Sequence, residues 1–249
     1  MLGILSDIGN VRKINEDYVG HFINREIGFY IVADGMGGHN AGEVASKLAV
    51  ETIIDNIKSL KDYENIEEIL IESILKANEK VYKLAKENSK LKGMGTTVTA
   101  CLVKNQNMVV ANVGDSSCYK LKKNGVFKIT KDHSYVQQLI DKGTITKEEA
   151  NTHPNKNVIT RALGTFDSVK VDTFSVNLND VYKVLLCTDG LTNYVNENEM
   201  YDIIMNNKTD NKLACNQLVD LSNLKGGKDN ISVILFEGEC RDDRENVGR

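Results

Sequence analysis

The sequence lacks the features that mark several common classes of protein. No apolar run approaches the roughly 20 residues that a membrane-spanning helix needs, and no basic segment followed by a long apolar stretch stands at the N-terminus. The five cysteines form no Cys-x-x-Cys pair, and their odd number and scatter favour reduced, packed thiols. The formal net charge of −4 argues against a broad nucleic-acid surface, which is normally strongly basic. We therefore expect a soluble, cytoplasmic protein with neither nucleic acid nor a membrane as its partner.

Histidine and proline are also scarce. Only four histidines are present, which argues against zinc. The only proline, Pro154, lies in a polar stretch from 131 to 170, which we interpret as a flap subdomain over a functional site. With 249 residues and 41% hydrophobic content, the rest of the chain can bury a large core. We expect one domain over residues 1–240, a charged tail at 241–249 that frays, and a monomer.

Apolar periodicity predicts a mixture of helices and strands. Two amphipathic stripes predict consecutive long helices over 42–60 and 66–87. A short apolar run over 29–33 is typical of a buried strand, and Asp34-Gly35 after it predicts a turn. Further strands are predicted over 96–103, 108–113, 118–121, 126–129, 182–186 and 231–236. We interpret the first four of these as an antiparallel meander, with a hairpin turn at Lys123-Asn124-Gly125.

Carboxylates stand beside the ends of predicted strands. Asp34 precedes Gly35 and Asp189 precedes Gly190, so each carboxylate is expected to project from a rigid edge while the Gly35 carbonyl stays open to a ligand. Three more carboxylates lie near such ends or in the N-terminal motif: Asp229, Glu16 and Asp17. Groups this far apart in sequence can converge only if the whole chain folds as one domain.

An oxygen-lined site of this kind suits hard divalent cations. Mg²⁺ and Mn²⁺ prefer carboxylate and carbonyl oxygens. Two such ions held about 4 Å apart turn a shared water into a hydroxide nucleophile and stabilise charge on phosphoryl oxygens. Arg12 lies close in sequence to Glu16 and Asp17, and a planar guanidinium can clamp two phosphate oxygens. The residues therefore predict hydrolysis of a phosphate ester with two metal ions per chain.

Six motifs in order along the chain carry a family resemblance. They are Ser-Asp-Ile-Gly-Asn-Val-Arg-Lys-Ile-Asn-Glu-Asp (6–17), Ala-Asp-Gly-Met-Gly-Gly (33–38), Gly-Met-Gly-Thr-Thr (93–97), Asn-Val-Gly-Asp-Ser (112–116), Thr-Asp-Gly-Leu-Thr (188–192) and Lys-Asp-Asn-Ile-Ser (228–232). Together they resemble the bacterial branch of the metal-dependent protein Ser/Thr phosphatases, the protein phosphatase 2C-like or PPM family. The resemblance implies an α+β fold, a four-layer αββα sandwich of two antiparallel sheets flanked by helix pairs, with a dinuclear Mn²⁺ or Mg²⁺ centre.

The resemblance also implies roles for individual residues. Asp34 bridges the two metals and the Gly35 carbonyl joins one of them, while Asp189 and Asp229 hold the other. Glu16 and Asp17 act directly or through water, and Arg12 takes the substrate phosphate. Asp115, together with Asp189, matches a third metal site found in bacterial members.

The chain departs from the family pattern at two positions. Ser117 stands where bacterial members usually carry arginine, which weakens the case for the third metal site. Met36 stands where many eukaryotic members place histidine, so the acid that protonates the leaving group stays open between His39 and a metal-bound water. The stretch with His133 and His153 resembles the family's flap, which affects substrate choice more than bond cleavage.

By resemblance, the chain hydrolyses phosphoserine or phosphothreonine in proteins by direct attack of a metal-bridging hydroxide, without a covalent phosphoenzyme. Its implied partners are a cognate Ser/Thr kinase and that kinase's substrates. A cysteine-dependent phosphatase is disfavoured because no Cys-x5-Arg loop is present. Two alternatives stay open: a non-catalytic pseudophosphatase that binds phosphoproteins or a regulator, and a phosphatase for small signalling phosphates.

Overall fold

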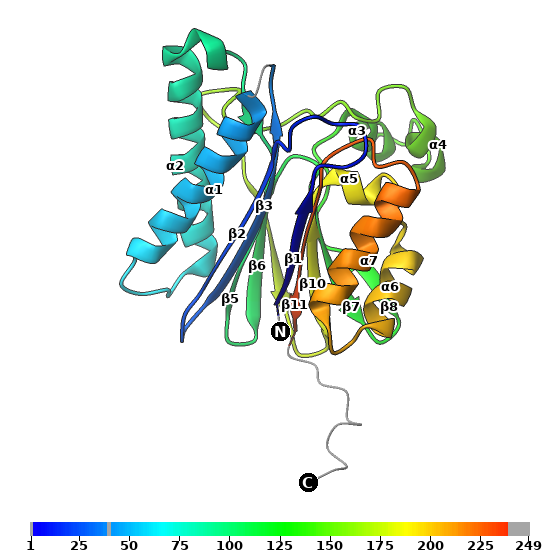
Figure 1. The fold of residues 1–249 in the computed structure, drawn as a ribbon. Coiled ribbons are helices and arrows are strands. Elements are labelled where there is room, and N and C mark those ends of the chain that lie inside the picture. The colour runs from blue at the N-terminus through cyan, green and yellow to red at the C-terminus, as the bar shows by residue number, and fades with distance from the viewer. Residues whose placement is uncertain (1, 39–40, 239–249) are drawn as a thin grey trace.

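A computed structural model describes residues 2–38 and 41–238 and shows four layers (Figure 1). Two antiparallel sheets stack in the middle, helices α1 and α2 cover one outer face, and α5, α6 and α7 cover the other. Three buried apolar clusters separate the layers, one under each helix layer and one between the sheets. The αββα sandwich implied by the resemblance is therefore confirmed.

The first sheet combines the first and last strands of the described chain with three strands from between them. Its strands lie in the order β1 (Leu2–Asp7), β11 (Ile231–Glu237), β10 (Lys183–Cys187), β7 (Ser117–Lys122) and β8 (Gly125–Lys128). The helices over it are α5 (Asp189–Thr192), α6 (Glu197–Asn206) and α7 (Asn211–Leu224). Leu218 of α7 packs with Leu185 and Val233 in the cluster between this helix layer and the sheet.

The second sheet carries the two long helices. Its strands lie in the order β2 (Asp17–Ile23), β3 (Gly28–Met36), β5 (Val98–Lys104), β6 (Asn107–Val113) and β9 (Asp172–Asn177), and short β4 (Gly95–Thr96) pairs with the end of β3. The helices are α1 (Ala41–Ser59) and α2 (Ile66–Glu87), followed by a 3₁₀ turn, η1 (Ser89–Leu91). Both predicted helices, 42–60 and 66–87, are confirmed.

The sequence of strand β3 does not alternate between apolar and polar residues, because both of its sides are buried. Phe29 and Ile31 face the helix layer, whereas Tyr30 and Val32 face the other sheet, so both sides of the strand are buried. Tyr30 stacks on Phe236 of β11 with ring centroids 3.9 Å apart. This contact joins the two sheets through their shared core.

Two expectations about the strands are wrong, one about where β3 ends and one about how four later strands are arranged. Strand β3 does not stop before Asp34-Gly35 but continues to Met36, because Asp34 pairs with Asp17 of β2 and Gly35 pairs with Thr96 of β4. The region 96–129 is not one meander but two hairpins in different sheets. The chain crosses between the sheets after β6, where Gly114 has φ +114°, a conformation that side-chain-bearing residues rarely adopt.

The polar stretch 131–170 lies at one end of the sandwich. It contains α3 (Tyr135–Asp141) and α4 (Lys147–Thr152), which lie near α5 at the upper right of Figure 1. A β-bridge between Ser134 and Ile159 joins the two halves of this stretch. A second β-bridge, between Leu163 and Thr96, joins the stretch to β4. The predicted tail, 241–249, and His39 lie outside the described residues. None of the helices in the described part of the chain is long and apolar enough to cross a membrane.

Candidate metal centre

Two facing aspartates of the second sheet form the start of the site. Asp17, the first residue of β2, lies directly opposite Asp34 in the register of β2 and β3. Asp17 is almost fully buried, and its Oδ2 accepts a hydrogen bond of 2.8 Å from Thr188 Oγ1, next to Asp189 at the start of α5. Thr188 belongs to the first sheet's side, so this bond connects residues of both sheets at one site.

The backbone of Asp34 is fixed by two threonines. Its N–H donates to Thr97 Oγ1 at 2.9 Å, and its carbonyl accepts from Thr97 N at 2.8 Å and from Thr96 Oγ1 at 3.0 Å. Thr97 Oγ1 also lies 2.8 Å from Ser116 Oγ, next to Asp115. The sequence predicted only that a strand begins here, at Thr96, and the positioning role of both threonines was missed.

The glycines after Asp34 and Asp189 are required by close packing rather than by turns. A Cβ on Gly35 would lie 2.1 Å from the carbonyl oxygen of Gly42, and one on Gly190 would lie 2.0 Å from that of Asn230. Asp189-Gly190 begins helix α5 instead of forming a turn. The two glycines therefore let other segments of backbone pack directly beside the residues that follow the carboxylates.

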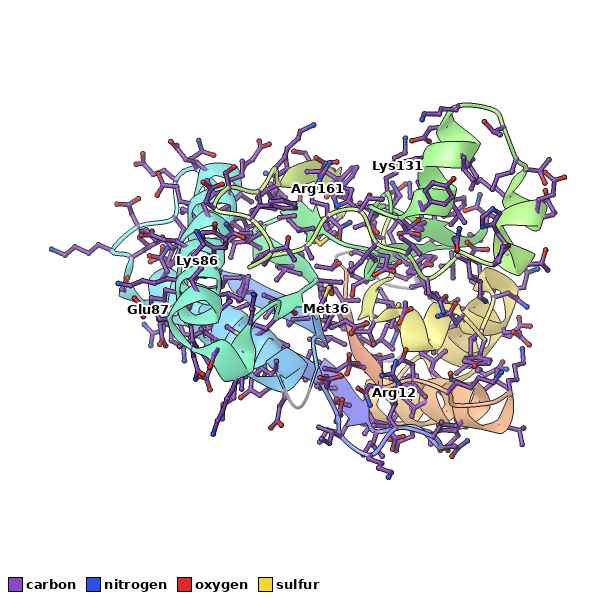
Figure 2. The ribbon with its side chains drawn as sticks, turned by 90° about the horizontal axis from the view of Figure 1, so that it is seen from above. Arg12, Met36, Lys86, Glu87, Lys131 and Arg161 are labelled. Carbon is purple, nitrogen blue, oxygen red and sulfur yellow. The ribbon has the colours of Figure 1, made fainter. Side chains whose placement is uncertain are left out.

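Arg12 and Asp229 lie at the open side of the site. An Arg12 guanidinium nitrogen donates to the Asp229 carboxylate at 2.9 Å, with 46% and 31% of the two side chains exposed. Asn230 holds the loop that carries Arg12: its Oδ1 accepts from Glu16 N at 2.9 Å and its Nδ2 donates to the carbonyls of Ile8 and Ile14, each at 3.0 Å. Figure 2 shows Arg12 on this loop, near α7.

Burial and mutual repulsion raise the pKa of the carboxyl groups. Desolvation is the main cause in each case, and neighbouring carboxylates add to it. The pKa rises to about 7 for Asp17 and to about 8 for Asp115, and it lies well above the usual range for Asp34. The pKa values of Asp189 and Glu16 are raised as well. Repulsion by Asp17, Asp189, Asp115 and Asp229 adds to the rise for Asp34, so these four carboxylates all lie near enough to act on it.

These residues fit divalent cations. The Oδ1 atoms of Asp17 and Asp189 are buried without a hydrogen-bond partner, and Asn193 Nδ2 satisfies only the Oδ2 of Asp189, at 3.0 Å. Within residues 2–38 and 41–238, no group of three or more His, Cys, Asp or Glu side chains could hold a metal ion on its own. Mg²⁺ commonly takes one or two carboxylates and keeps several waters, so this set suits ions completed by water or substrate.

The structure brings the residues predicted for the site together. They are Arg12, Glu16, Asp17, Asp34, Gly35, Asp115, Asp189 and Asp229, and their roles as ligands stay predictions. Sequence reasoning missed the residues that position them: Thr96, Thr97, Thr188, Asn193 and Asn230. Four of them lie inside the quoted motifs and Asn193 directly follows one, which is the signal that could have drawn attention to them.

The sequence of the chain is similar to that of known proteins. Residues 14–231 match the family described as protein phosphatase 2C. The chain is 43% identical over 236 residues to the serine/threonine phosphatase stp of Listeria welshimeri, with 93% of each chain covered. It is 35% identical over 249 residues to the protein phosphatase PhpP of Streptococcus pneumoniae, covering 94% of this chain and 96% of the relative.

Solved structures agree with this match. The crystal structure of the serine/threonine phosphatase Stp1 from Staphylococcus aureus has a TM-score of 0.90 and 39% identity, and the match covers 95% of each chain. The catalytic domain of the phosphatase PstP, in complex with two manganese ions, has a TM-score of 0.81 and 30% identity, with 94% and 96% covered. With the family match extending over most of its length, the chain belongs to the protein phosphatase 2C family.

Proposed function

We propose that this protein phosphatase hydrolyses phosphoserine and phosphothreonine in proteins at a dinuclear Mn²⁺ or Mg²⁺ centre. The observation that carries the proposal is the buried oxygen cluster: Asp17 and Asp189 each present an unpartnered Oδ1 beside Asp34. Buried carboxylates without partners are costly unless a cation compensates them. The two manganese ions in the PstP structure and the phosphatase names of the relatives support the same conclusion.

We propose the ligand set that the family resemblance implies. Asp34, whose carboxyl group is repelled by four neighbouring carboxylates, would contribute to both ions, and the Gly35 carbonyl would be a further ligand of one. Asp189 and Asp229 would hold the other ion, and Glu16 and Asp17 would contribute directly or through water. Asp115, with Asp189, would form the third site. The bound ions would activate water for attack on phosphorus and neutralise charge on the phosphoryl oxygens.

Arg12 would bind the substrate phosphate. Its guanidinium is half exposed and held at the edge of the carboxylate cluster by Asp229, so that other N–H groups of the fork stay free for phosphoryl oxygens. The loop that carries it is fixed by Asn230. Arg12 can therefore orient the phosphate without an ordering cost for the loop.

A cleft beside the centre could accept the polypeptide around the phosphorylated residue. It has a volume of about 510 Å³ and runs from Asp115 and Asp189 between α3, α4 and the start of α6. We propose that residues 131–170 act here as a flap that selects substrates within a single domain of residues 1–240. We also propose that the protein acts in the cytoplasm as a monomer and opposes a Ser/Thr kinase.

Phosphate release from a phosphothreonine peptide tests the proposal. The wild-type protein should release phosphate with Mn²⁺ and not after chelation, and Asp189→Ala should lose turnover by orders of magnitude. Asp202→Ala, which removes an exposed carboxylate from α6, should behave as the wild type. If the folded wild type releases no phosphate from several peptides with either Mn²⁺ or Mg²⁺, the catalytic proposal is wrong.

A further inference from the structure

A second cleft lies at the end of α2, away from Asp189 and the flap helices. It has a volume of about 540 Å³ and is formed by the last turn of α2, the η1 turn and the segment at 164–165. We call it the lysine cleft and define it by six of its lining residues: Tyr82, Lys86, Ser89, Lys92, Gly164 and Thr165. None of the predicted metal ligands lines it, and neither does Arg12.

The lysine cleft lies in the most basic part of α2. Between residues 76 and 92 the sequence has six lysines and two glutamates, although the chain as a whole has a formal charge of −4. All six lysines are exposed: Lys76, Lys80, Lys83, Lys86, Lys90 and Lys92. Of the two glutamates, Glu87 lies 3.9 Å from Lys83 in a solvent-exposed ion pair, and such a pair contributes little to stability. The region therefore presents an excess of positive charge on an acidic protein.

The two lysines of the cleft are available to a ligand. Lys86 lies over the ring of Tyr82, 4.5 Å from its centroid, which holds the ammonium group at the cleft wall. Within the described part of the chain, neither Lys86 nor Lys92 forms an ion pair with a carboxylate. The pKa of Lys86 is raised mainly by Tyr82 and slightly by Asp167, which is near but forms no ion pair with it. Two ammonium groups beside a concave surface therefore stay available to a ligand with several carboxylates.

One wall of the lysine cleft is joined to the metal centre. Gly164 N donates to Oδ1 of the buried Asn78 at 2.8 Å, which fixes the segment to α2. The preceding residue, Leu163, pairs with Thr96 through bonds of 3.1 and 2.9 Å, and Thr96 Oγ1 donates to the carbonyl of Asp34. In the view from above, Lys86 and Arg12 lie on opposite sides of Met36 (Figure 2).

We propose that the lysine cleft binds an acidic segment of a phosphoprotein substrate while its phosphorylated residue lies at Arg12. This inference rests on the proposed function, because the occupant is a substrate of the same site. Charge complementarity and the connection to Asp34 through Leu163 and Thr96 favour this occupant. A single-stranded nucleic acid is disfavoured because Tyr82 is the one aromatic side chain in the cleft lining, too few to stack a run of bases.

Direct binding tests the cleft without catalysis. A fluorescein-labelled peptide of eight glutamates should raise its anisotropy on binding to the full chain, and Lys86→Glu/Lys92→Glu should weaken this binding about tenfold or more. The control Lys61→Glu/Lys212→Glu has the same charge change, in the turn before α2 and in the first turn of α7, and should bind as the wild type. Equal binding by both double variants would overturn the proposal, and so would a single-stranded DNA octamer that binds more tightly than the peptide.

Kinetics then separate the cleft from the catalytic proposal. The substrate is a phosphothreonine peptide joined by a flexible spacer of about 12 residues, long enough to span up to about 40 Å, to an acidic run. Its KM should rise about tenfold in Lys86→Glu/Lys92→Glu, whereas a matched peptide with glutamines and p-nitrophenyl phosphate should be hydrolysed unchanged. If the wild type hydrolyses both peptides with equal KM, the inference fails while the proposed function stands. If no substrate is hydrolysed, the proposed function fails. Binding of the glutamate peptide then decides by itself whether the lysine cleft binds an acidic segment.

Discussion

Asp17 and Asp34 lie directly opposite each other across β2 and β3, where two like charges repel. Burial raises the pKa of both carboxyl groups, and Asp189 increases the repulsion on each. An apolar pair would suit the core of an antiparallel sheet better. The site is therefore locally less stable than an apolar pair would be, but it concentrates negative charge that a cation can bind.

Neutralising Asp17 should stabilise the metal-free protein and reduce its stabilisation by metal. Asp17→Asn removes one charge from the cluster and keeps an oxygen for Thr188, so we expect the metal-free melting temperature to rise by about 2–4 °C, which corresponds to about 1 kcal/mol. Mn²⁺ should raise the melting temperature of the wild type because it binds only the folded state, and this rise should shrink in the variant. Differential scanning fluorimetry measures both, with Asp202→Asn as the control. A variant that is less stable without metal and equally stabilised by Mn²⁺ would contradict the prediction.

The raised pKa values set the pH dependence of the metal-free protein. The pKa is about 7 for Asp17 and about 8 for Asp115, whereas the ordinary value for Asp in an unfolded chain is about 4. Between these limits the folded state binds more protons than the unfolded state, so the free energy of unfolding falls as pH rises. Melting temperatures of chelated protein should therefore decrease from about pH 5 to pH 8, and less steeply in Asp115→Asn. A melting temperature that rises over this interval would show that the clustered carboxyls do not dominate.

The resemblance and the helix patterns predicted much of the fold, but the sequence concealed where segments meet. The stripe of Leu70, Ile74, Ala77 and Val81 defines α2 by itself, because burial against one sheet imposes the helical period. Strand β3 was cut short at Ala33 because Asp-Gly is an ordinary turn signal, and only the long-range partners of Asp34 and Gly35 keep it extended.

The positioning residues of the site were hidden for a similar reason. Thr188 and Asn230 are common turn and cap residues, and their function depends on partners about 170 to 220 positions away in the chain. Helices α6 and α7 were not predicted individually, although α7 buries Ala214, Leu218 and Val219 at helical spacing. The aspartates themselves were found because six motifs occur together, which needs no knowledge of contacts.

Arg12 should affect substrate binding more than the chemical step. Arg12→Ala removes charge-assisted hydrogen bonds to phosphate, each contributing about 1.5–3 kcal/mol, so the KM for a phosphothreonine peptide should rise roughly 10- to 100-fold. Steady-state kinetics with Mn²⁺ measures this, and Lys13→Ala on the same loop is the matched control. Unchanged KM and kcat in Arg12→Ala would rule out Arg12 as the phosphate clamp.

Thr188 should couple the two sheets to the metal centre. Its fully buried Oγ1 donates to Asp17 Oδ2 at 2.8 Å and accepts from Ser232 N at 3.0 Å, so one hydroxyl holds β11 and β2 in place. Thr188→Val keeps the volume but leaves both partners unsatisfied, which should lower the free energy of unfolding by about 1–3 kcal/mol and weaken Mn²⁺ binding. Thr188→Ser retains the hydroxyl and should preserve Mn²⁺ affinity. Denaturant unfolding and Mn²⁺ titration calorimetry measure the two effects, and equal affinities for Mn²⁺ in the valine and serine variants would show that this bond does not orient Asp17.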